Sequence, residues 1–259
     1  MWFSTTKLES NIFLIREPFF KISPSYLTYF TNLYLIIGPE KSLLIDTGTG
    51  IHNIANEISP IVQNREVVIF TTHRHWDHIN GHHNFPDCKI LLHSIDKPYL
   101  LKDELIPLDS KRKITRKALL DQQMICIDEN TELNFEGLDT EIVHLPGHTG
   151  GSIALWLKNY DMIFVGDAIQ TGFVYADENP NEFKQSLEKL NSLIKDQKNI
   201  KIMSSHEDLY LSVNDVEQLL IAFDESISNI NYTQPIQTDT VKARMFCAGK
   251  FQILYPWKE

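Results

Sequence analysis

The chain has 259 residues and a formal net charge of −10, from 34 acidic and 24 basic side chains. This length suits one large domain or two small ones, and hydrophobic and charged fractions of 42% and 22% exclude a coiled coil or a disordered chain. The acidic balance argues against a nucleic-acid partner, which would need clustered lysines and arginines.

Apolar runs of strand length alternate with helical patterns, which predicts an α/β fold. Residues 33–37 and 42–45 predict a hairpin, because the turn signal Gly38-Pro39 follows the first run. Isoleucines at helical spacing predict a helix over 51–61, and strands are predicted at 67–70 and 89–92. Residues 95–125 interrupt this alternation with two prolines and a basic cluster, and we interpret them as a helical insertion.

The alternation returns after the insertion. The predicted strands cover residues 140–145, 152–157, 162–165 and 201–203, and helices are predicted over 187–194 and 216–223. A last strand pair is predicted over 244–255, around Gly249. Because the sequence shows no low-complexity linker and no clear change of composition, we expect a single domain over 1–259 that contains the insertion at about 95–125.

The three cysteines, Cys88, Cys126 and Cys247, lie far apart, and none forms a Cys-Xaa-Xaa-Cys pair. We therefore expect three buried, reduced thiols in a cytoplasmic protein, with neither a disulfide framework nor a thiolate zinc site. The first residues show no signal-peptide pattern. No apolar run approaches the roughly 20 residues of a membrane span, so no association with a membrane is expected.

The ten histidines are the unusual feature of the composition, and they concentrate where predicted strands end. The strand at 67–70 runs into four side chains that can bind a metal: His73, His75, Asp77 and His78. Residues two apart in extended backbone face the same way, so His73 and His75 share a side. Imidazole and carboxylate ligands without a thiol suit zinc, with iron or manganese as alternatives. A polar loop at the surface explains this cluster poorly, because such a loop has no need of histidines.

Three more candidate ligands follow later strands. His148 comes just after the strand at 140–145 and is surrounded by glycines, which allow close backbone approach. Asp167 ends the strand at 162–165, and His206 follows the strand at 201–203. Open sheets gather their sites at such strand ends, so the three side chains are expected to join the first cluster.

Taken in order, these motifs resemble those of the metallo-β-lactamase-fold hydrolase superfamily. The resemblance rests on His73-Xaa-His75-Xaa-Asp77-His78, Gly147-His148, Gly166-Asp167 and Ser205-His206, with an upstream Asp46-Thr47-Gly48 turn. It covers nearly the whole chain and implies an αββα sandwich, in which two mixed β-sheets are flanked by helices and the site lies at one edge.

The resemblance also implies a role for each ligand. The first metal would be held by His73, His75 and His148, the second by Asp77, His78 and His206, and Asp167 would bridge the two. Two divalent ions, zinc by preference, would supply a metal-bound hydroxide that attacks a carbonyl or phosphorus. Asp77 would position this nucleophile or carry a proton to the leaving group. Asp46 would orient the ligands from outside, or would be a turn residue bonded to its own backbone.

We expect a small-molecule substrate, but the sequence does not identify it. The sequence also leaves open whether the protein forms a homo-oligomer. We expect hydrolysis of an ester, thioester or lactone. The alternatives are a phosphodiesterase or nuclease on the same dinuclear site, and a mononuclear-iron persulfide dioxygenase. Trp76, the run 79–82 and Tyr175 resemble a branch of the superfamily that includes an acyl-CoA thioesterase. Tyr175 would hydrogen-bond a substrate oxygen, as a tyrosine does in lactonases of this fold, or is a half-buried packing residue.

Overall fold

The computed structural model describes residues 2–23, 25–100, 123–176, 178–229, 233–238 and 241–257. The predicted helical insertion therefore falls mostly outside the described residues, and only its two ends can be compared. Its first end contains a short helix, α3 (Lys97–Leu100). Its last end, predicted as helical up to residue 125, belongs instead to a strand, β7 (Gln123–Ile127), which pairs in parallel with the neighbouring strand β6.

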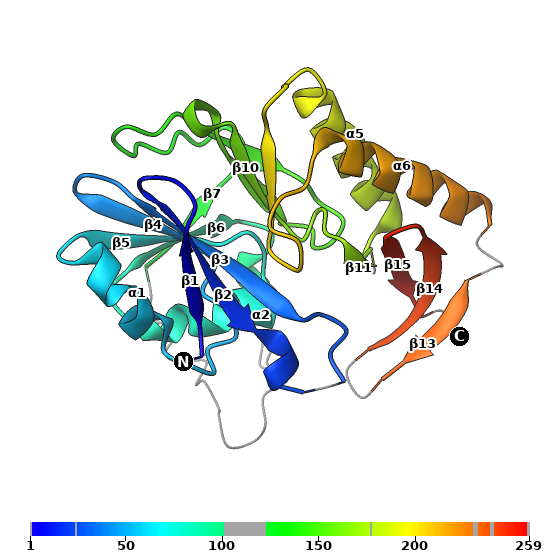
Figure 1. Cartoon of the computed structure of the whole chain (residues 1–259), viewed down its shortest axis with the longest axis horizontal. Coiled ribbons are helices and arrows are strands. Elements are labelled where there is room, and N and C mark those ends of the chain that lie inside the picture. The colour runs from blue at the N-terminus through cyan, green and yellow to red at the C-terminus, as the bar shows by residue number, and fades with distance from the viewer. Residues whose placement is uncertain are drawn as a thin grey trace.

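The first sheet has seven strands that follow chain order (Figure 1). They are β1 (Ser4–Lys7), β2 (Ile12–Pro18), β3 (Phe30–Ile37), β4 (Lys41–Ile45), β5 (Glu66–Phe70), β6 (Lys89–His93) and β7. The pairs from β1 to β4 are antiparallel and those from β4 to β7 are parallel, so the sheet is mixed. Its connecting helices are α1 (Ile54–Val62), α2 (Trp76–Ile79) and α3, with 3₁₀ turns η1 (Phe19–Lys21) and η2 (Asn80–Asn84).

The second sheet is also mixed, with the strand order β12-β10-β9-β8. Its strands are β8 (Thr140–His144), β9 (Ile153–Leu157), β10 (Met162–Gly166) and β12 (Lys201–Ser204), and the 3₁₀ turn η4 (Lys158–Tyr160) joins β9 to β10. The strands β8, β9 and β10 are antiparallel, whereas β12 runs parallel to β10. The parallel pair places the carboxyl ends of β10 and β12 side by side.

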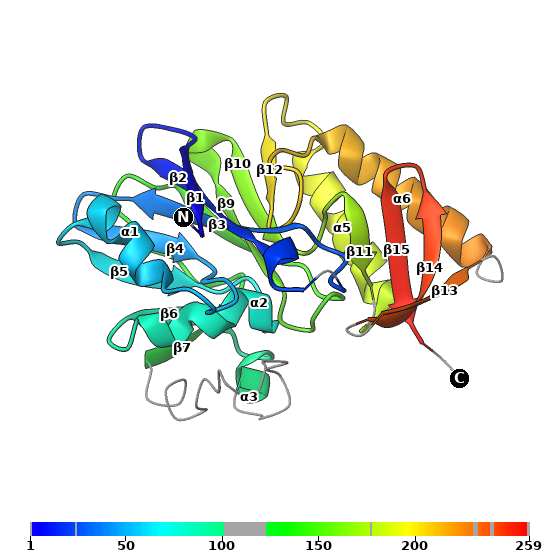
Figure 2. The ribbon, with the colours of Figure 1, turned by 60° about the horizontal axis from the view of Figure 1, so that its bottom comes forward.

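A third sheet was not predicted. It has the order β11-β15-β14-β13 and consists of β11 (Gly172–Tyr175), β13 (Gln234–Gln237), β14 (Lys242–Ala248) and β15 (Phe251–Pro256). The hairpin of β14 and β15 confirms the strand pair predicted over 244–255. Two helices, α5 (Pro180–Ile194) and α6 (Val213–Ser228), lie between this sheet and the second one (Figure 2). Their apolar faces share one core with Val143 and Ile163 of the second sheet and with Phe251 and Ile253 of the third.

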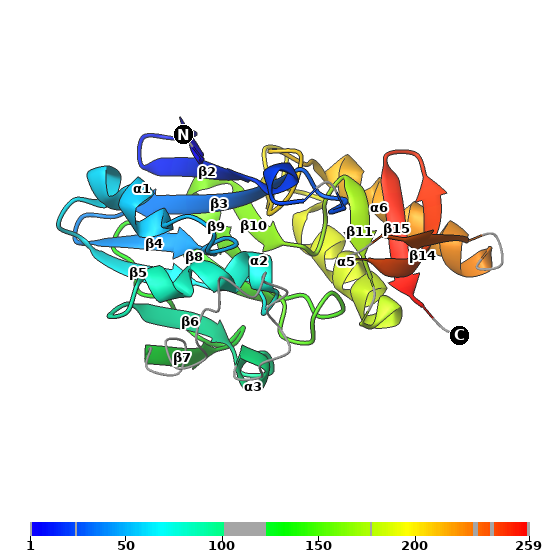
Figure 3. The same ribbon diagram turned by 90° about the horizontal axis from the view of Figure 1, so that it is seen from below.

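The two larger sheets pack face to face, and side-chain alternation along β3 shows how. Tyr34 and Ile36 point into the core between the first and second sheets, whereas Leu33 and Leu35 point into the core beneath α1 and α2. A strand buried on both faces has no polar alternation, which explains the continuous apolar runs in the sequence. Helices on the outer faces of two stacked sheets give the predicted αββα sandwich, seen from below in Figure 3.

The cysteines are less buried than predicted. Cys88 is half-buried, and Cys126 and Cys247 are exposed; all three are free thiols. Cys126 lies on β7, which among the described residues is the last strand of its sheet and has a neighbouring strand on one side only. In the described part of the chain, no helix is both long enough and apolar enough to cross a membrane.

Candidate active site

The seven predicted ligands come together in space, at the ends of strands β5, β8, β10 and β12. They form three overlapping groups, in each of which the potential ligand atoms lie within 4.8 Å of one another. The groups are His73, His75 and His148; His73, His78 and Asp167; and Asp77, His78 and His206. The seven residues suggested by the sequence therefore form one cluster, which spans both larger sheets.

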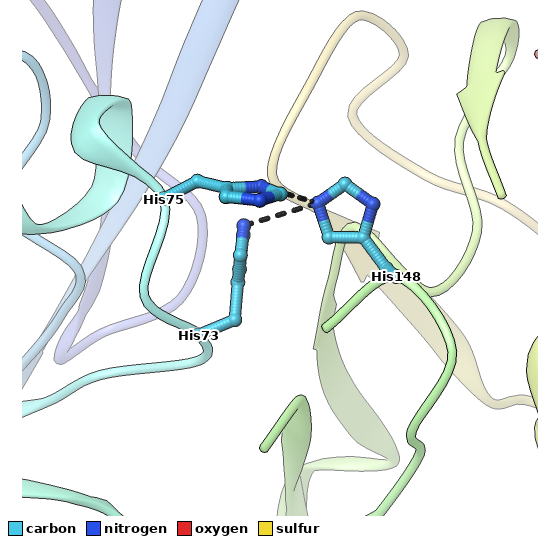
Figure 4. Close-up of side chains that lie close together, drawn as sticks. All are labelled: His73, His75 and His148. Atoms are coloured by element: carbon cyan, nitrogen blue, oxygen red, sulfur yellow. Dashed lines mark hydrogen bonds between the residues drawn. The ribbon is translucent and has the colours of Figure 1, made fainter. Parts of the chain in front are cut away.

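The first group is a triangle of imidazoles, shown in Figure 4. His148 Nε2 lies 2.8 Å from His75 Nδ1 and 3.2 Å from His73 Nε2. The three ring planes are close to perpendicular, with angles of 85°, 79° and 86°. Lone pairs lie in the ring planes, so perpendicular rings can direct three of them at one point, as metal coordination requires.

The outer nitrogens of this group are held by hydrogen bonds. His148 Nδ1 donates to the backbone carbonyl of Tyr175 (2.8 Å), and His73 Nδ1 donates to Thr72 Oγ1 (3.0 Å). These bonds leave the Nε2 atoms of His73 and His148 directed inward. A histidine that binds a metal typically donates its other ring N–H in this way, which fixes its tautomer and ring orientation.

We call Asp77, His78 and His206 the second group, and they lie around the carboxylate of Asp167. Asp167 Oδ1 lies 3.5 Å from His78 Nε2, and Asp167 Oδ2 lies 3.3 Å from both His206 Nε2 and His148 Nε2. Asp77 Oδ2 lies 3.5 Å from His206 Nε2 and 3.6 Å from His78 Nε2. Asp167 thus contacts members of both groups, as a bridging ligand would.

Two buried atoms of the cluster lack hydrogen bonds. Among the residues that the structure describes, His78 Nε2 and Asp167 Oδ1 have no hydrogen-bond partner. Leaving such buried polar atoms unpaired costs free energy. Cations placed among these imidazoles and carboxylates would satisfy both atoms, so the donor set fits the metal ions that the resemblance implies.

Asp46 lies behind this cluster and contacts two of its loops. Its Oδ2 accepts hydrogen bonds from His78 Nδ1 and Thr72 Oγ1, both at 2.7 Å, and its Oδ1 accepts one from the Thr72 backbone N–H at 2.8 Å. Thr72 in turn accepts the hydrogen bond from His73. This geometry matches the orienting position predicted for Asp46. On the far side, His206 Nδ1 donates to the backbone carbonyl of Phe30 (2.8 Å).

Without metal ions, the histidines of the cluster have pKa shifts in opposite directions. Burial and the neighbouring imidazoles hold the pKa of His73 and His75 well below the usual value, so both rings are neutral. Burial also opposes a charge on His78, but the carboxylates of Asp167, Asp77 and Asp46 outweigh it and raise the pKa of His78 to about 10. Divalent cations would take the place of the proton on His78 and compensate the same carboxylates.

A second histidine cluster has a different geometry. Potential ligand atoms of His93, Glu129 and His144 lie within 4.8 Å of one another. The two imidazoles are stacked, with centroids 4.3 Å apart and planes only 10° from parallel. Lone pairs in parallel planes do not converge, so this pair does not share the arrangement of the triangle formed by His73, His75 and His148.

A pocket with a volume of about 260 Å³ opens beside the cluster. It is lined by Phe19, Tyr26, Leu27, Thr28, His75, Trp76, Asp77, His148, Asp167, Tyr175, His206 and Val241. Tyr175 is thus at the site, as predicted. The lining residues Phe19, Tyr26, Leu27, Thr28 and Val241 were not predicted, because they belong to η1 and to loops whose sequence carries no ligand-type side chain.

Three of the lining residues form an aromatic wall, which we define as Phe19, Tyr26 and Trp76. Their ring centroids lie 4.6 Å apart for Phe19 and Tyr26, 5.3 Å for Phe19 and Trp76, and 5.5 Å for Tyr26 and Trp76. Phe19 also makes an edge contact with the ligand ring of His206, at 6.3 Å. An apolar surface therefore meets the metal-ligand cluster directly.

Residues 27–206 match the family model described as "Metallo-beta-lactamase superfamily". The chain belongs to the metallo-beta-lactamase superfamily. It is a hydrolase of this superfamily. The matched range contains all seven predicted ligands, and the superfamily fold implies metal ions at the cluster that they form.

Several relatives of this superfamily member carry the names of thioesterases. Acyl-coenzyme A thioesterase MBLAC2 of Gallus gallus is 24% identical over 234 residues, which cover 81% of this chain and 82% of that protein. The Homo sapiens protein of the same name is 24% identical over 196 residues, which cover 66% and 68%. An atrochrysone carboxyl ACP thioesterase of Emericella nidulans is 29% identical over 166 residues, covering 62% and 48%.

Solved structures of the superfamily share the fold. A metallo-beta-lactamase family protein from Thermus thermophilus aligns with a TM-score of 0.64 at 19% identity, covering 86% of this chain and 82% of that one. A metallo-beta-lactamase from Erythrobacter litoralis aligns with a TM-score of 0.66 at 16% identity, covering 86% and 97%. Likeness at this level of identity establishes the architecture of the chain and leaves its substrate open.

The loop that carries His148 has no room for a side chain at Gly147. This residue has a φ of +127°, and a Cβ there would lie 2.2 Å from the backbone nitrogen of Phe183. We therefore expect Gly147→Ala to lower the free energy of unfolding by about 2–4 kcal/mol, measured by denaturant titration. Gly249→Ala is the matched control, because Gly249 also has positive φ but has open space around it; it should cost only about 1–2 kcal/mol. Equal losses would contradict the packing argument.

Proposed function

We propose that this protein is a dinuclear metal-dependent thioesterase whose substrate carries an apolar acyl group, as acyl-CoA thioesters do. One observation supports this most: Asp167 contacts members of two three-ligand groups, and these groups lie against the aromatic wall. The proposal assigns one metal to His73, His75 and His148 and the other to Asp77, His78 and His206, with Asp167 between them. Zinc is the metal we favour, because all of the proposed ligands are imidazoles or carboxylates.

When bound, the metal ions supply Lewis-acid polarisation of the substrate oxygen and lower the pKa of water at the site. In the balanced reaction, the oxygen of water bonds to the thioester carbon, the C–S bond breaks, and a proton ends on the sulfur. Asp77 lines the pocket, and its Oδ2 faces His78 and His206. We assign its other oxygen, Oδ1, to hold this proton and pass it to the leaving sulfur. The products are a carboxylic acid and a thiol.

The pocket suits the reacting end of such a substrate. Its volume of about 260 Å³ lies just below the range of roughly 300–1,000 Å³ that encloses a drug-sized ligand. We infer that it receives the thioester and the adjoining part of the acyl chain, while the rest of a coenzyme A stays outside. The aromatic wall offers the acyl chain an apolar surface, and Tyr175 is our candidate to hydrogen-bond the substrate oxygen.

A substrate panel on the zinc-loaded protein tests this proposal. The panel compares acyl-CoA thioesters of several chain lengths with a lactone and with a chromogenic phosphodiester. We expect kcat/KM to be highest for thioesters, by at least about 100-fold over the phosphodiester. A preference for the phosphodiester would overturn the choice of substrate and support a phosphodiesterase or nuclease on the same metals. Iron in the purified protein, with oxygen consumption on glutathione persulfide, would support the dioxygenase instead.

The aromatic wall makes a separate prediction about chain length. Phe19 is 4% exposed and faces the pocket, whereas its neighbour Phe20 is 43% exposed and is not part of the lining. Burying an aromatic or aliphatic side chain against another apolar group contributes about 1.5–3 kcal/mol. Phe19→Ala should therefore lower the ratio of kcat/KM for long over short acyl-CoA by about 10- to 100-fold. Phe20→Ala, the matched control, should leave this ratio unchanged.

The ratio is the readout because both rates are measured on the same variant. A loss of folded protein, which truncation of a buried phenylalanine can cause, would lower both rates equally. An unchanged ratio in Phe19→Ala, or an equal change in Phe20→Ala, would show that the aromatic wall does not bind the acyl chain.

A further inference from the structure

Asp96 is a buried carboxylate between β6 and α3 that the sequence did not single out. Its side chain is only 1% exposed, and its two oxygens accept four hydrogen bonds. Oδ1 accepts from Arg74 Nη1 (2.8 Å) and from the Gly151 backbone N–H (3.0 Å). Oδ2 accepts from the Arg74 backbone N–H (2.9 Å) and from Thr149 Oγ1 (2.8 Å).

The donors of these bonds are the chain neighbours of metal ligands. Arg74 lies between His73 and His75, and Thr149 directly follows His148. One carboxylate thus ties together the two loops that carry all three ligands of the first group. The second group has a different anchor, because Asp46 accepts the hydrogen bond from His78.

The packing around Asp96 is close. A Cβ on Gly151 would lie 2.5 Å from Asp96 Cγ, so the loop after His148 approaches the carboxylate as only a glycine can. The Arg74 guanidinium, itself nearly buried, forms an ion pair with Asp96 and stacks on the Tyr99 ring at 4.0 Å. A buried charge that is both paired and fully hydrogen-bonded holds its neighbours in one arrangement.

We propose that Asp96 is a positioning residue for the first metal site, where it fixes the distance between the His73–His75 loop and the His148 loop. Asp46 is the corresponding positioning residue for the second site, where it accepts the hydrogen bond from His78. This inference rests on the dinuclear centre of the proposed function, and it concerns metal affinity and not the choice of substrate. It predicts that a change at Asp96, which is not itself a metal ligand, weakens the first site and spares the second.

Asp96→Asn is the sharpest variant, because asparagine keeps the shape and replaces one oxygen by an NH₂ group. That group cannot accept hydrogen bonds, so about half of the four bonds are lost together with the charge that pairs with Arg74. Changes in the outer contacts of metal ligands typically lower metal affinity about 10- to 100-fold. We expect a loss of this size at the first site alone.

The experiment titrates metal-free protein with Co²⁺ and follows the two binding steps by calorimetry and by the visible spectrum. A three-histidine site and a site with two histidines and a carboxylate are expected to differ in the visible spectrum. Asp96→Asn should raise the Kd of the three-histidine step about 10- to 100-fold and leave the other step within a factor of about three. Asp46→Asn should weaken the second step most, because His78 loses its acceptor, and should weaken the first step less, because Thr72 links Asp46 to His73. Asp139→Asn, at an exposed aspartate, is the matched control and should change neither step.

Equal weakening of both steps in Asp96→Asn, or no weakening at the first, would overturn the inference. If Asp96→Asn fails to fold, as the circular dichroism spectrum would reveal, Thr149→Val replaces it and removes a single hydrogen bond to Asp96. A selective weakening of the first step in Thr149→Val supports the inference, and the absence of one overturns it. Wild-type protein that binds two metals but cleaves no thioester would contradict the proposed function while leaving this test valid.

Discussion

Replacing Asp77 by asparagine should lower kcat for thioester hydrolysis by about 10²- to 10⁴-fold, the usual contribution of a positioned acid–base group. Asp77 is the carboxylate of the second ligand group that also lines the pocket, with Oδ2 3.5 Å from His206 Nε2. An amide in its place cannot take up the proton, and it is a poorer ligand for a divalent cation.

Steady-state kinetics on metal-analysed protein checks this result, with Asp139→Asn as the control at an exposed aspartate. The fold should survive, because Asp77 lies on the first turn of the short helix α2 and at the pocket surface. Wild-type kcat in a folded, fully metal-loaded Asp77→Asn protein would refute the role assigned to Asp77.

Asp167→Asn should weaken the binding of both metals and, with Asp77→Asn, should cause the largest loss of activity that we expect. Asp167 contacts His148 of the first group and His78 and His206 of the second, at 3.3–3.5 Å. In the metal-free protein, burial opposes the charge on Asp167, but the imidazoles of His206 and His78 outweigh it and keep the pKa of Asp167 well below its usual range. The carboxylate is therefore ionised and available to the cations.

The expected result is a metal content clearly below two per chain and a kcat at least about 10³-fold below wild type. This expectation follows because metal polarisation contributes several kcal/mol and each step of about 1.4 kcal/mol is tenfold in rate. Metal analysis by mass spectrometry and kinetics at saturating zinc provide the two readouts. Two tightly held metals in Asp167→Asn would show that this carboxylate does not join the sites.

Much of the fold was predictable, because strands buried on both faces have a strong apolar signature. The runs around Leu35 and Ile69 mark the centre of the first sheet. The third sheet was harder to predict: β11 and β13 are four residues long, and in β13 the pair Pro235-Ile236 is flanked by glutamines, without an alternating pattern. β11 gains its structure from a long-range pairing with β15, and β13 gains its structure from pairing with the neighbouring strand β14.

The cluster of candidate metal ligands was also predictable, since several histidines and aspartates that directly follow strands are seldom needed for structure alone. The residues that support the cluster were not. Asp96 sits in an ordinary loop sequence, and its four hydrogen bonds depend on two loops that are distant from it in the chain. The aromatic wall was hard to predict for the same reason, because Phe19 and Tyr26 are distant from Trp76 in the chain and contact it only in the folded structure.

The most direct test of the dinuclear thioesterase is the rate of acyl-CoA hydrolysis as zinc is added to metal-free protein. Activity should rise from background and reach its plateau at two equivalents of zinc per chain, because both ligand groups face the same pocket. A plateau at one equivalent, or full activity before any zinc is added, would contradict a dinuclear thioesterase.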